Sequence, residues 1–123
     1  MKVMESAENY LETILMLKAA NGNVRSIDIA NELGYSKPSV SVAMKRLREK
    51  GQIIVGENGS IELTDSGKEI AEKIYERHVF LTDALEKIGV SPDVASEDAC
   101  RVEHYISEET FDCLKKYIET KMK

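Results

Sequence analysis

The sequence predicts a mainly α-helical protein, with an N-terminal winged helix-turn-helix that carries a two-stranded β wing and an all-helical part after it. Three observations predict this fold. Two short amphipathic helical patterns are separated by a tight break, two short β-branched runs follow directly, and further helical patterns continue to the end of the chain. We expect one domain over residues 1–70 and a second, all-helical domain over residues 71–123.

The helix-turn-helix is expected between Ser26 and Gly51. Gly34 is placed to end its first helix, because glycine readily adopts the left-handed conformation common at helix C-termini. Ser36 can cap the second helix, and Pro38 is tolerated in a first turn, where the backbone N–H has no helical partner. The apolar stripe of the second helix is formed by Val40, Met44 and Leu47.

The outward face of the second helix is basic. Between Lys37 and Lys50 the sequence has five basic residues and one acidic residue, a net charge of +4 in a chain whose net charge is −5. Such a local concentration of cations is typical of a helix that enters the major groove of DNA, although an ordinary helix pair with a solvated basic face is an alternative. The residues expected to contact base edges are Lys37, Ser39 and Ser41. Those expected to contact phosphates are Lys45, Arg46 and Arg48.

The flanking segments favour DNA binding over that alternative. Residues 6–20 predict a preceding helix with Ser6 as its cap. After the second helix come two β-branched runs, Ile53–Val55 and Ile61–Leu63, around an Asn-Gly pair that is typical of a hairpin. A hairpin directly after a recognition helix is a wing, and the complete pattern indicates a protein that binds double-stranded DNA.

Three further helices are expected in the second part of the chain. Thr64 can cap a long helix that ends at Gly89. Ser91 and Pro92 begin a shorter helix that runs to about residue 106, and Ser107 begins the last one. The long helix has a stripe formed by Ile70, Ile74, His78, Leu81, Leu85 and Ile88. These helices are too few for an independent core, so their apolar faces indicate a homodimer.

One helix of the second part carries three possible metal ligands. Cys100, Glu103 and His104 lie at i, i+3 and i+4, so a thiol, a carboxylate and an imidazole share one face. These donors suit a first-row divalent metal such as Fe, Co, Ni or Zn better than Mg or Ca. Further candidate ligands are His78, Asn9 and Glu12. Taken singly, each has a plainer explanation, such as a buried thiol, a solvated Glu-His pair or a core histidine.

Four segments carry a resemblance to a known family: AENYLETI at Ala7–Ile14, IANELGYSKPSVSVAMKRL at Ile29–Leu47, LTDSGKEIAEKIYERH at Leu63–His78 and DACRVEH at Asp98–His104. The chain resembles the diphtheria-toxin-repressor and manganese-transport-regulator family of metal-dependent transcriptional repressors, in order over nearly all of its length. The resemblance implies a winged-helix head, a helical dimerisation and metal-binding domain, and activation by Fe(II) or Mn(II). Larger members add an SH3-like third domain, which we do not expect because the chain ends too soon.

The resemblance also implies the ligands in the second part. Cys100, Glu103 and His104 match the primary metal site of the iron-responsive members, and His78 matches a histidine that both branches use. Cys100 replaces the glutamate expected of a manganese regulator. Because a thiolate is soft and Mn(II) is lowest in the affinity order, Fe(II) is favoured over Mn(II), and Co(II), Ni(II) or Zn(II) would bind in vitro.

The resemblance places two residues of the first helix at ligand positions of the family. Glu12 resembles a ligand of the manganese branch, and Asn9 falls where that branch has an aspartate and the iron branch a methionine. An amide oxygen is uncharged, so Asn9 should bind a divalent ion less tightly than a carboxylate would. Thr82 and Ser96 fall where the iron branch has Glu and His for an ancillary site, so this second site is expected to be absent or altered.

Metal binding is expected to control DNA binding. A site that joins the first helix to the second domain would fix the orientation of the two heads of a homodimer. A palindromic operator presents successive major grooves about 34 Å apart, and only one head spacing matches them. By family inference, the expected role is to repress metal-uptake genes when metal is plentiful.

Composition and missing motifs exclude other classes of protein. The chain has 123 residues, 42% of them apolar, and no apolar run long enough for a membrane span or signal peptide. Its two cysteines form no disulfide framework, so we expect a soluble cytoplasmic protein with reduced thiols. We also expect neither a membrane partner nor a small-molecule substrate. A metal-independent winged-helix regulator is the main alternative. A metallohydrolase with Glu103 as general base is disfavoured, because no nucleophile motif or phosphate loop occurs, and we expect no enzyme activity.

Overall fold

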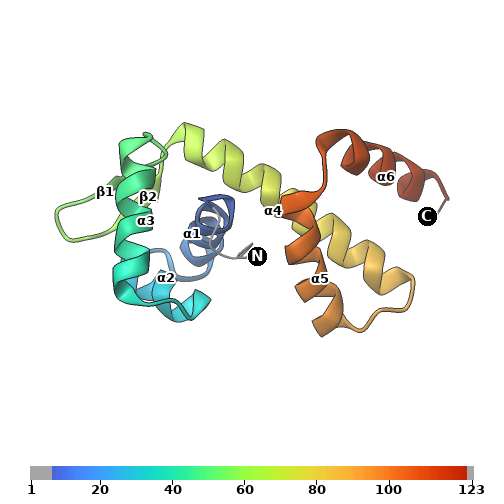
Figure 1. Ribbon diagram of the computed structural model, residues 1–123, viewed down its shortest axis with the longest axis horizontal. Coiled ribbons are helices and arrows are strands. Elements are labelled where there is room, and N and C mark those ends of the chain that lie inside the picture. The colour runs from blue at the N-terminus through green and yellow to red at the C-terminus, as the bar shows by residue number, and fades with distance from the viewer. Residues whose placement is uncertain (1–6, 122–123) are drawn as a thin grey trace. The chain divides into compact units, whose positions relative to one another are not determined.

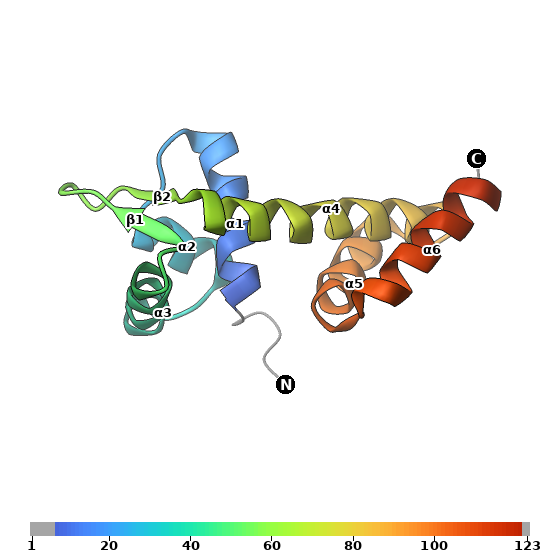
Figure 2. The same ribbon diagram turned by 90° about the horizontal axis from the view of Figure 1, so that it is seen from above.

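Figures 1 and 2 show the computed structural model, which describes residues 7–121. Within these residues the chain forms helices and one two-stranded antiparallel sheet. The elements are α1 (Ala7–Asn21), α2 (Ser26–Leu33), α3 (Lys37–Glu49), β1 (Ile53–Val55), β2 (Ile61–Leu63), α4 (Asp65–Lys87), α5 (Pro92–Tyr105) and α6 (Glu108–Lys121). The predicted fold class is confirmed, whereas Ser6, the expected cap of α1, lies outside the described residues. None of the helices in residues 7–121 combines the length and apolarity that crossing a membrane requires.

Contacts divide the chain into two compact units. The first unit extends to Lys73 and contains the helix-turn-helix and the wing, and the second begins at Ile74 and contains α5 and α6. The boundary falls inside α4, which contributes its first turns to one unit and its later turns to the other. The exact domain boundary, expected after residue 70, stays a prediction.

The turn between α2 and α3 forms as its residue types predict. Gly34 ends α2 with a φ of 72°, and its N–H donates to the carbonyl of Ala30 at 2.8 Å. Ser36 caps α3, because its Oγ accepts a hydrogen bond from the N–H of Ser39 at 3.3 Å. Pro38 lies in the first turn of α3, where its missing N–H costs nothing. These local interactions fix where α3 begins and therefore which of its residues face outward.

An apolar core joins the helices of the first unit. α1 contacts α2, α3 and β2, and Figure 1 shows these elements gathered together. The buried core residues are Tyr10, Leu11, Ile14, Val24, Ile29, Ala30, Val40, Met44, Leu47, Ile53, Ile61 and Ala71. The predicted apolar stripe of α3 is therefore confirmed, because all three of its members are buried in this core.

The wing is an antiparallel hairpin, as predicted. Ile53 lies opposite Leu63 and Val55 opposite Ile61. In the connecting loop Gly59 has a φ of 81°, a conformation that favours glycine. Ile53 and Ile61 are buried at the base of the wing, while the loop projects from it (Figure 2). The wing is thus held by the same core that holds the recognition helix.

The start of α4 passes close to the backbone that follows α3. Thr64 caps α4 by accepting a hydrogen bond from the N–H of Gly67 at 3.2 Å, and its hydroxyl donates to the carbonyl of Gly51 at 2.7 Å. A Cβ atom at position 67 would overlap the carbonyl oxygen of Gln52. Only glycine therefore fits here without a shift of the backbone.

The second unit has a small core between the later turns of α4, α5 and α6. Its buried members are Leu81, Ala99 and Phe111. The rings of Phe80 and Phe111 meet edge to face, with their centres 5.6 Å apart. The prediction that Ile88 belongs to the apolar stripe of α4 is wrong, because α4 ends at Lys87 and Ile88 is 65% exposed.

Candidate metal centre and nucleic-acid interface

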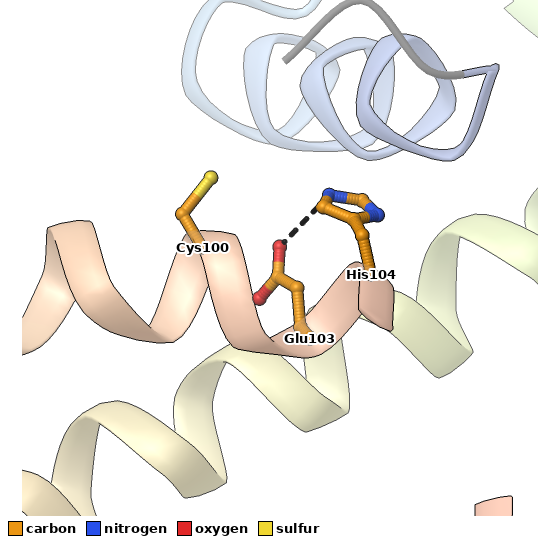
Figure 3. A group of neighbouring side chains, drawn as sticks. All are labelled: Cys100, Glu103 and His104. Carbon is orange, nitrogen blue, oxygen red and sulfur yellow. Dashed lines mark ion pairs between the residues drawn. The ribbon is translucent and has the colours of Figure 1, made fainter. Parts of the chain in front are cut away.

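α5 brings the three donors of its motif to one face. Ser91 precedes the helix in an extended conformation, Pro92 occupies its first turn, and the helix continues to Tyr105. Figure 3 shows three side chains projecting from neighbouring turns of α5, namely Cys100, Glu103 and His104. Their ligand atoms, a thiol sulfur, a carboxylate oxygen and an imidazole nitrogen, all lie within 4.8 Å of one another. The helical spacing therefore does group these donors.

The carboxylate of Glu103 is fully buried between two imidazoles. Its Oε2 lies 3.0 Å from Nδ1 of His78 on α4, and its Oε1 lies 3.4 Å from Nε2 of His104. A buried carboxylate costs free energy unless cations or hydrogen-bond donors compensate it. A carboxylate, two imidazoles and a thiol are also the donor types of first-row divalent metal sites. The arrangement of His78, Cys100, Glu103 and His104 therefore fits a divalent transition-metal ion.

Arg77 is not among the predicted site residues, but its side chain contacts the helix that carries these donors. Its Nη1 donates to the main-chain carbonyls of Glu103 and Ile106, both at 3.2 Å. The sequence does contain a signal for such a role. Arg77 is a cation on an apolar stripe, three residues after Ile74 and four before Leu81, so it is placed to face the interior of the second unit.

The other two predicted ligands lie on α1, in the first unit. Asn9 and Glu12 are 3% and 4% exposed, and the neighbouring Thr13 is 6% exposed. Amide and carboxylate side chains are seldom buried in a helix unless they interact with a partner. α1 therefore carries oxygen donors that are shielded from solvent, and their participation in a metal site stays a prediction.

α3 exposes every residue that the sequence predicts to contact DNA. The exposed residues are Lys37, Ser39, Ser41, Lys45, Arg46 and Arg48. The hydroxyl of Ser36 donates to Oγ of Ser39 at 3.0 Å, which orients the Ser39 hydroxyl at the start of the helix. Because the opposite side of α3 is buried, this polar and basic face points away from the core of the first unit.

A hollow of about 390 Å³ lies beside this face. Its lining residues are Tyr10, Pro38, Ser39, Val42, Ala43 and Arg46. Ser39 and Arg46 are among the predicted DNA-binding residues, whereas Tyr10 and Val42 are not. Val42 is 52% exposed. The sequence does indicate this apolar contact, because Val42 lies four residues after Pro38 on an otherwise polar helical face. The outward face of α3 thus offers apolar as well as charged contacts.

The sequence matches two family models that together span nearly the whole chain. Residues 2–59 match the model described as "Iron dependent repressor, N-terminal DNA binding domain". Residues 64–122 match the model described as "Iron dependent repressor, metal binding and dimerisation domain". The first match contains the exposed face of α3, and the second contains the donor cluster of α4 and α5.

Similar proteins agree with these matches. "Transcriptional regulator MntR" of Escherichia coli O6:H1 is 36% identical over 115 residues, which are 94% of this chain and 74% of that protein. A structure described as "Manganese-dependent transcriptional repressor complex with manganese" is 26% identical, with a TM-score of 0.78, and the match covers 91% of this chain and 53% of that chain. "Structure of the manganese regulator SloR" has the same fold, with 23% identity, a TM-score of 0.79 and coverage of 93% and 54%. The chain thus spans about half the length of these two solved chains.

Proposed function

We propose a function from the premise that the chain belongs to the iron-dependent repressor family, whose two domain models match it in order. Members of this family are transcriptional regulators, so the chain is a metal-dependent transcriptional regulator and not an enzyme. The alternatives of a metal-independent regulator and of a hydrolase that uses Glu103 as general base are therefore not favoured.

The proposed metal centre is built on the buried carboxylate of Glu103. His78, Cys100, Glu103 and His104 would hold a divalent ion, and we propose that Asn9 and Glu12 contribute further oxygen ligands. The observation that carries this proposal is a fully buried carboxylate beside two imidazoles, with a thiol among the grouped donors. A bound ion would supply positive charge that compensates the carboxylate and a thiolate in an interior where unpaired charge is costly.

The proposed switch couples metal binding to DNA binding. Ligands from α1 would tie the DNA-binding unit to the metal-binding unit, and the metal would then select one orientation of the two heads in a homodimer. On a palindromic operator, successive major grooves about 34 Å apart accept only one head spacing. Because coupling is reciprocal, operator DNA must tighten metal binding by the same factor.

Base edges and phosphates are the proposed targets of the exposed face of α3. Lys37, Ser39 and Ser41, near its start, are proposed to contact base edges. Lys45, Arg46 and Arg48 are proposed to contact phosphates and so to set the affinity for any duplex. Repression of metal-uptake genes is the proposed outcome of binding.

The preference for Fe(II) over Mn(II) that the sequence predicts is not supported by the similar proteins. The family models are described as iron dependent, but a 26% identical repressor structure is described as manganese-dependent and in complex with manganese. The thiol of Cys100 favours the later first-row ions, whereas the carboxylates of Glu103 and Glu12 suit Mn(II). We therefore propose a divalent transition metal and compare these two ions by experiment.

Co(II) absorption tests the proposed centre, because a thiolate ligand gives bound Co(II) an intense charge-transfer band. The wild type and Cys113→Ser should show this band on Co(II) titration, since Cys113 is exposed on α6. Cys100→Ser should lose it. A band that persists in Cys100→Ser, or one that is absent from the wild type, would contradict the proposed ligand set.

The metal is identified by anaerobic titration of DNA binding. A duplex selected by the metal-loaded protein from a random-sequence pool serves as the probe, and Fe(II) and Mn(II) are compared at matched free concentrations. The physiological ion should increase duplex affinity at a lower free concentration than the other ion. Duplex affinity that neither ion changes would contradict a metal-dependent regulator.

A further inference from the structure

Two adjacent residues of α4 contact Glu103, one at its side-chain carboxylate and the other at its main-chain carbonyl. His78 lies 3.0 Å from the side-chain carboxylate, while Nη1 of Arg77 donates to the main-chain carbonyl at 3.2 Å. The same Nη1 donates to the carbonyl of Ile106, also at 3.2 Å. Arg77 therefore binds two carbonyl groups that flank His104 in the sequence.

The carbonyl groups at the end of α5 need partners from outside the helix. The last four carbonyls of an α-helix have no N–H partner within it. α5 ends at Tyr105 because Ile106 is extended, with a ψ of 137°. A cation at a helix C-terminus also interacts favourably with the helix dipole. Arg77 thus stabilises the last turn of α5, which carries His104.

Phe111 of α6 supports the guanidinium group from another side. The guanidinium carbon of Arg77 lies 5.2 Å from the centre of the Phe111 ring, and Phe111 is buried. A planar guanidinium can stack on a ring while it donates hydrogen bonds in fixed directions, and a lysine ammonium cannot do both equally well. The position of Arg77 is therefore determined by α4, α5 and α6 together.

We propose that Arg77 is a positioning residue of the metal centre. By holding the carbonyls of Glu103 and Ile106, it fixes the backbone that presents Glu103 and His104 to a divalent ion, and it does not bind the ion itself. This inference rests on the proposed function of the centre. Loss of a group that orients metal ligands typically lowers metal affinity by about 10- to 100-fold.

Co(II) titration of the full chain carrying Arg77→Met or Arg77→Lys tests this role. We expect Arg77→Met to lower Co(II) affinity by about 10- to 100-fold and to change the d–d bands, which report the geometry around the ion. The thiolate charge-transfer band should persist, because Cys100 lies one turn earlier in α5. Arg77→Lys keeps a cation that can reach one carbonyl, so it should recover part of the affinity.

Lys115→Ala is a matched control, because it removes a different contact between α4 and α6, the helices that carry Arg77 and Phe111. Nζ of Lys115 lies 2.7 Å from Oε1 of Glu76, so this pair joins α6 to α4. The hydrogen bond with Glu76 raises the pKa of Lys115. We expect the Lys115→Ala variant to bind Co(II) with wild-type affinity and with wild-type d–d bands.

Urea unfolding of the metal-free variants separates positioning from general destabilisation. Wild-type affinity and d–d bands in Arg77→Met would overturn the proposal, and so would an equal loss of affinity in Lys115→Ala. If Arg77→Met does not fold, Arg77→Lys decides: unchanged affinity and bands overturn the role, whereas weaker binding at wild-type unfolding free energy supports it. A missing thiolate band in the wild type would instead contradict the proposed function, so the two failures are distinguishable.

Discussion

The first unit has a large continuous apolar core, whereas the second has a much smaller apolar core beside the fully buried carboxylate of Glu103. Among the described residues, twelve buried residues form the core cluster of the first unit and three form that of the second. Within residues 7–121, the second unit also exposes more large apolar side chains than the first, namely Tyr75, Val79, Ile88, Val94, Val102, Tyr105, Leu114 and Tyr117. Its residues are matched by a family model described as a metal binding and dimerisation domain.

This difference indicates what each unit needs in order to be stable. The first unit fills most of its interior with its own apolar side chains, so the stability that this apolar core supplies should not depend on a ligand. The second unit has a buried Glu103 and an exposed apolar surface, so we expect the proposed ion and a second copy of the chain to stabilise it further. Mutations in the two units should therefore differ in whether metal changes their effect.

The largest effect is expected from a cavity in the core of the first unit. Leu47 is 2% exposed on α3, and Leu47→Ala should lower the free energy of unfolding by about 2–5 kcal/mol, with or without metal. Urea denaturation monitored by circular dichroism measures this loss. Val42→Ala, at an exposed position of the same helix, should change stability by less than about 0.5 kcal/mol. Equal losses in the two variants would contradict the assigned core.

The second expected effect is metal-linked stability in the second unit. At a free metal concentration about 100 times Kd, a bound ion stabilises a folded protein by about 2.7 kcal/mol. Metal should raise the free energy of unfolding of the wild type by about this much over its metal-free form, and that of Glu103→Gln by far less. Thermal or urea unfolding with Mn(II) or with chelator gives both gains. A full gain in Glu103→Gln would remove Glu103 from the centre, and Glu109→Gln on the exposed start of α6 is the control.

A smaller effect is expected where α3 begins. Ser36→Ala removes the side-chain oxygen that accepts from the N–H of Ser39, and it should cost about 0.5–2 kcal/mol. The loss should be the same in the presence and absence of metal. Ser41→Ala, which removes a hydroxyl from the exposed face without touching the cap, should leave the unfolding free energy almost unchanged. A loss in Ser41→Ala equal to that in Ser36→Ala would show that the cap has no special importance.

The smallest effect is expected from Lys45, which is proposed to contact a phosphate. Lys45→Ala should lower affinity for every duplex by a similar factor and reduce the slope of log affinity against log salt by about 0.9. Fluorescence anisotropy with a selected and an unrelated duplex at several salt concentrations measures this slope. Lys116→Ala on α6 should leave the slope unchanged. A loss confined to one duplex would mean that Lys45 contacts a base edge instead.

Local chemistry explains why much of the first unit could be predicted. Gly34 ends α2, Ser36 caps α3, and the Asn58-Gly59 pair lies in the wing loop, because each residue type favours one backbone conformation. These choices depend on a few neighbouring residues. Cys100 and His104 likewise share a face because helical spacing alone brings them together.

The features that could not be predicted from the sequence depend on contacts between elements. Ile88 continues the apolar period of α4, but the helix ends one residue before it. The place of Arg77 on the apolar stripe of α4 indicates that it faces the interior, but not that it donates to carbonyls of α5. The burial of Asn9 and Glu12 also depends on what packs around α1. The sequence therefore predicts a polar face of this helix, but not that the face is buried.

The proposed switch depends on coupling between the metal centre and the exposed face of α3, and one measurement tests this coupling most directly. The affinity of the wild type and of His104→Ala for a selected duplex is measured across a metal titration, with circular dichroism to confirm folding. The wild type should bind far more tightly as metal is added, and His104→Ala should bind weakly and equally at every metal concentration. Metal stimulation of equal size in His104→Ala would contradict the proposed switch.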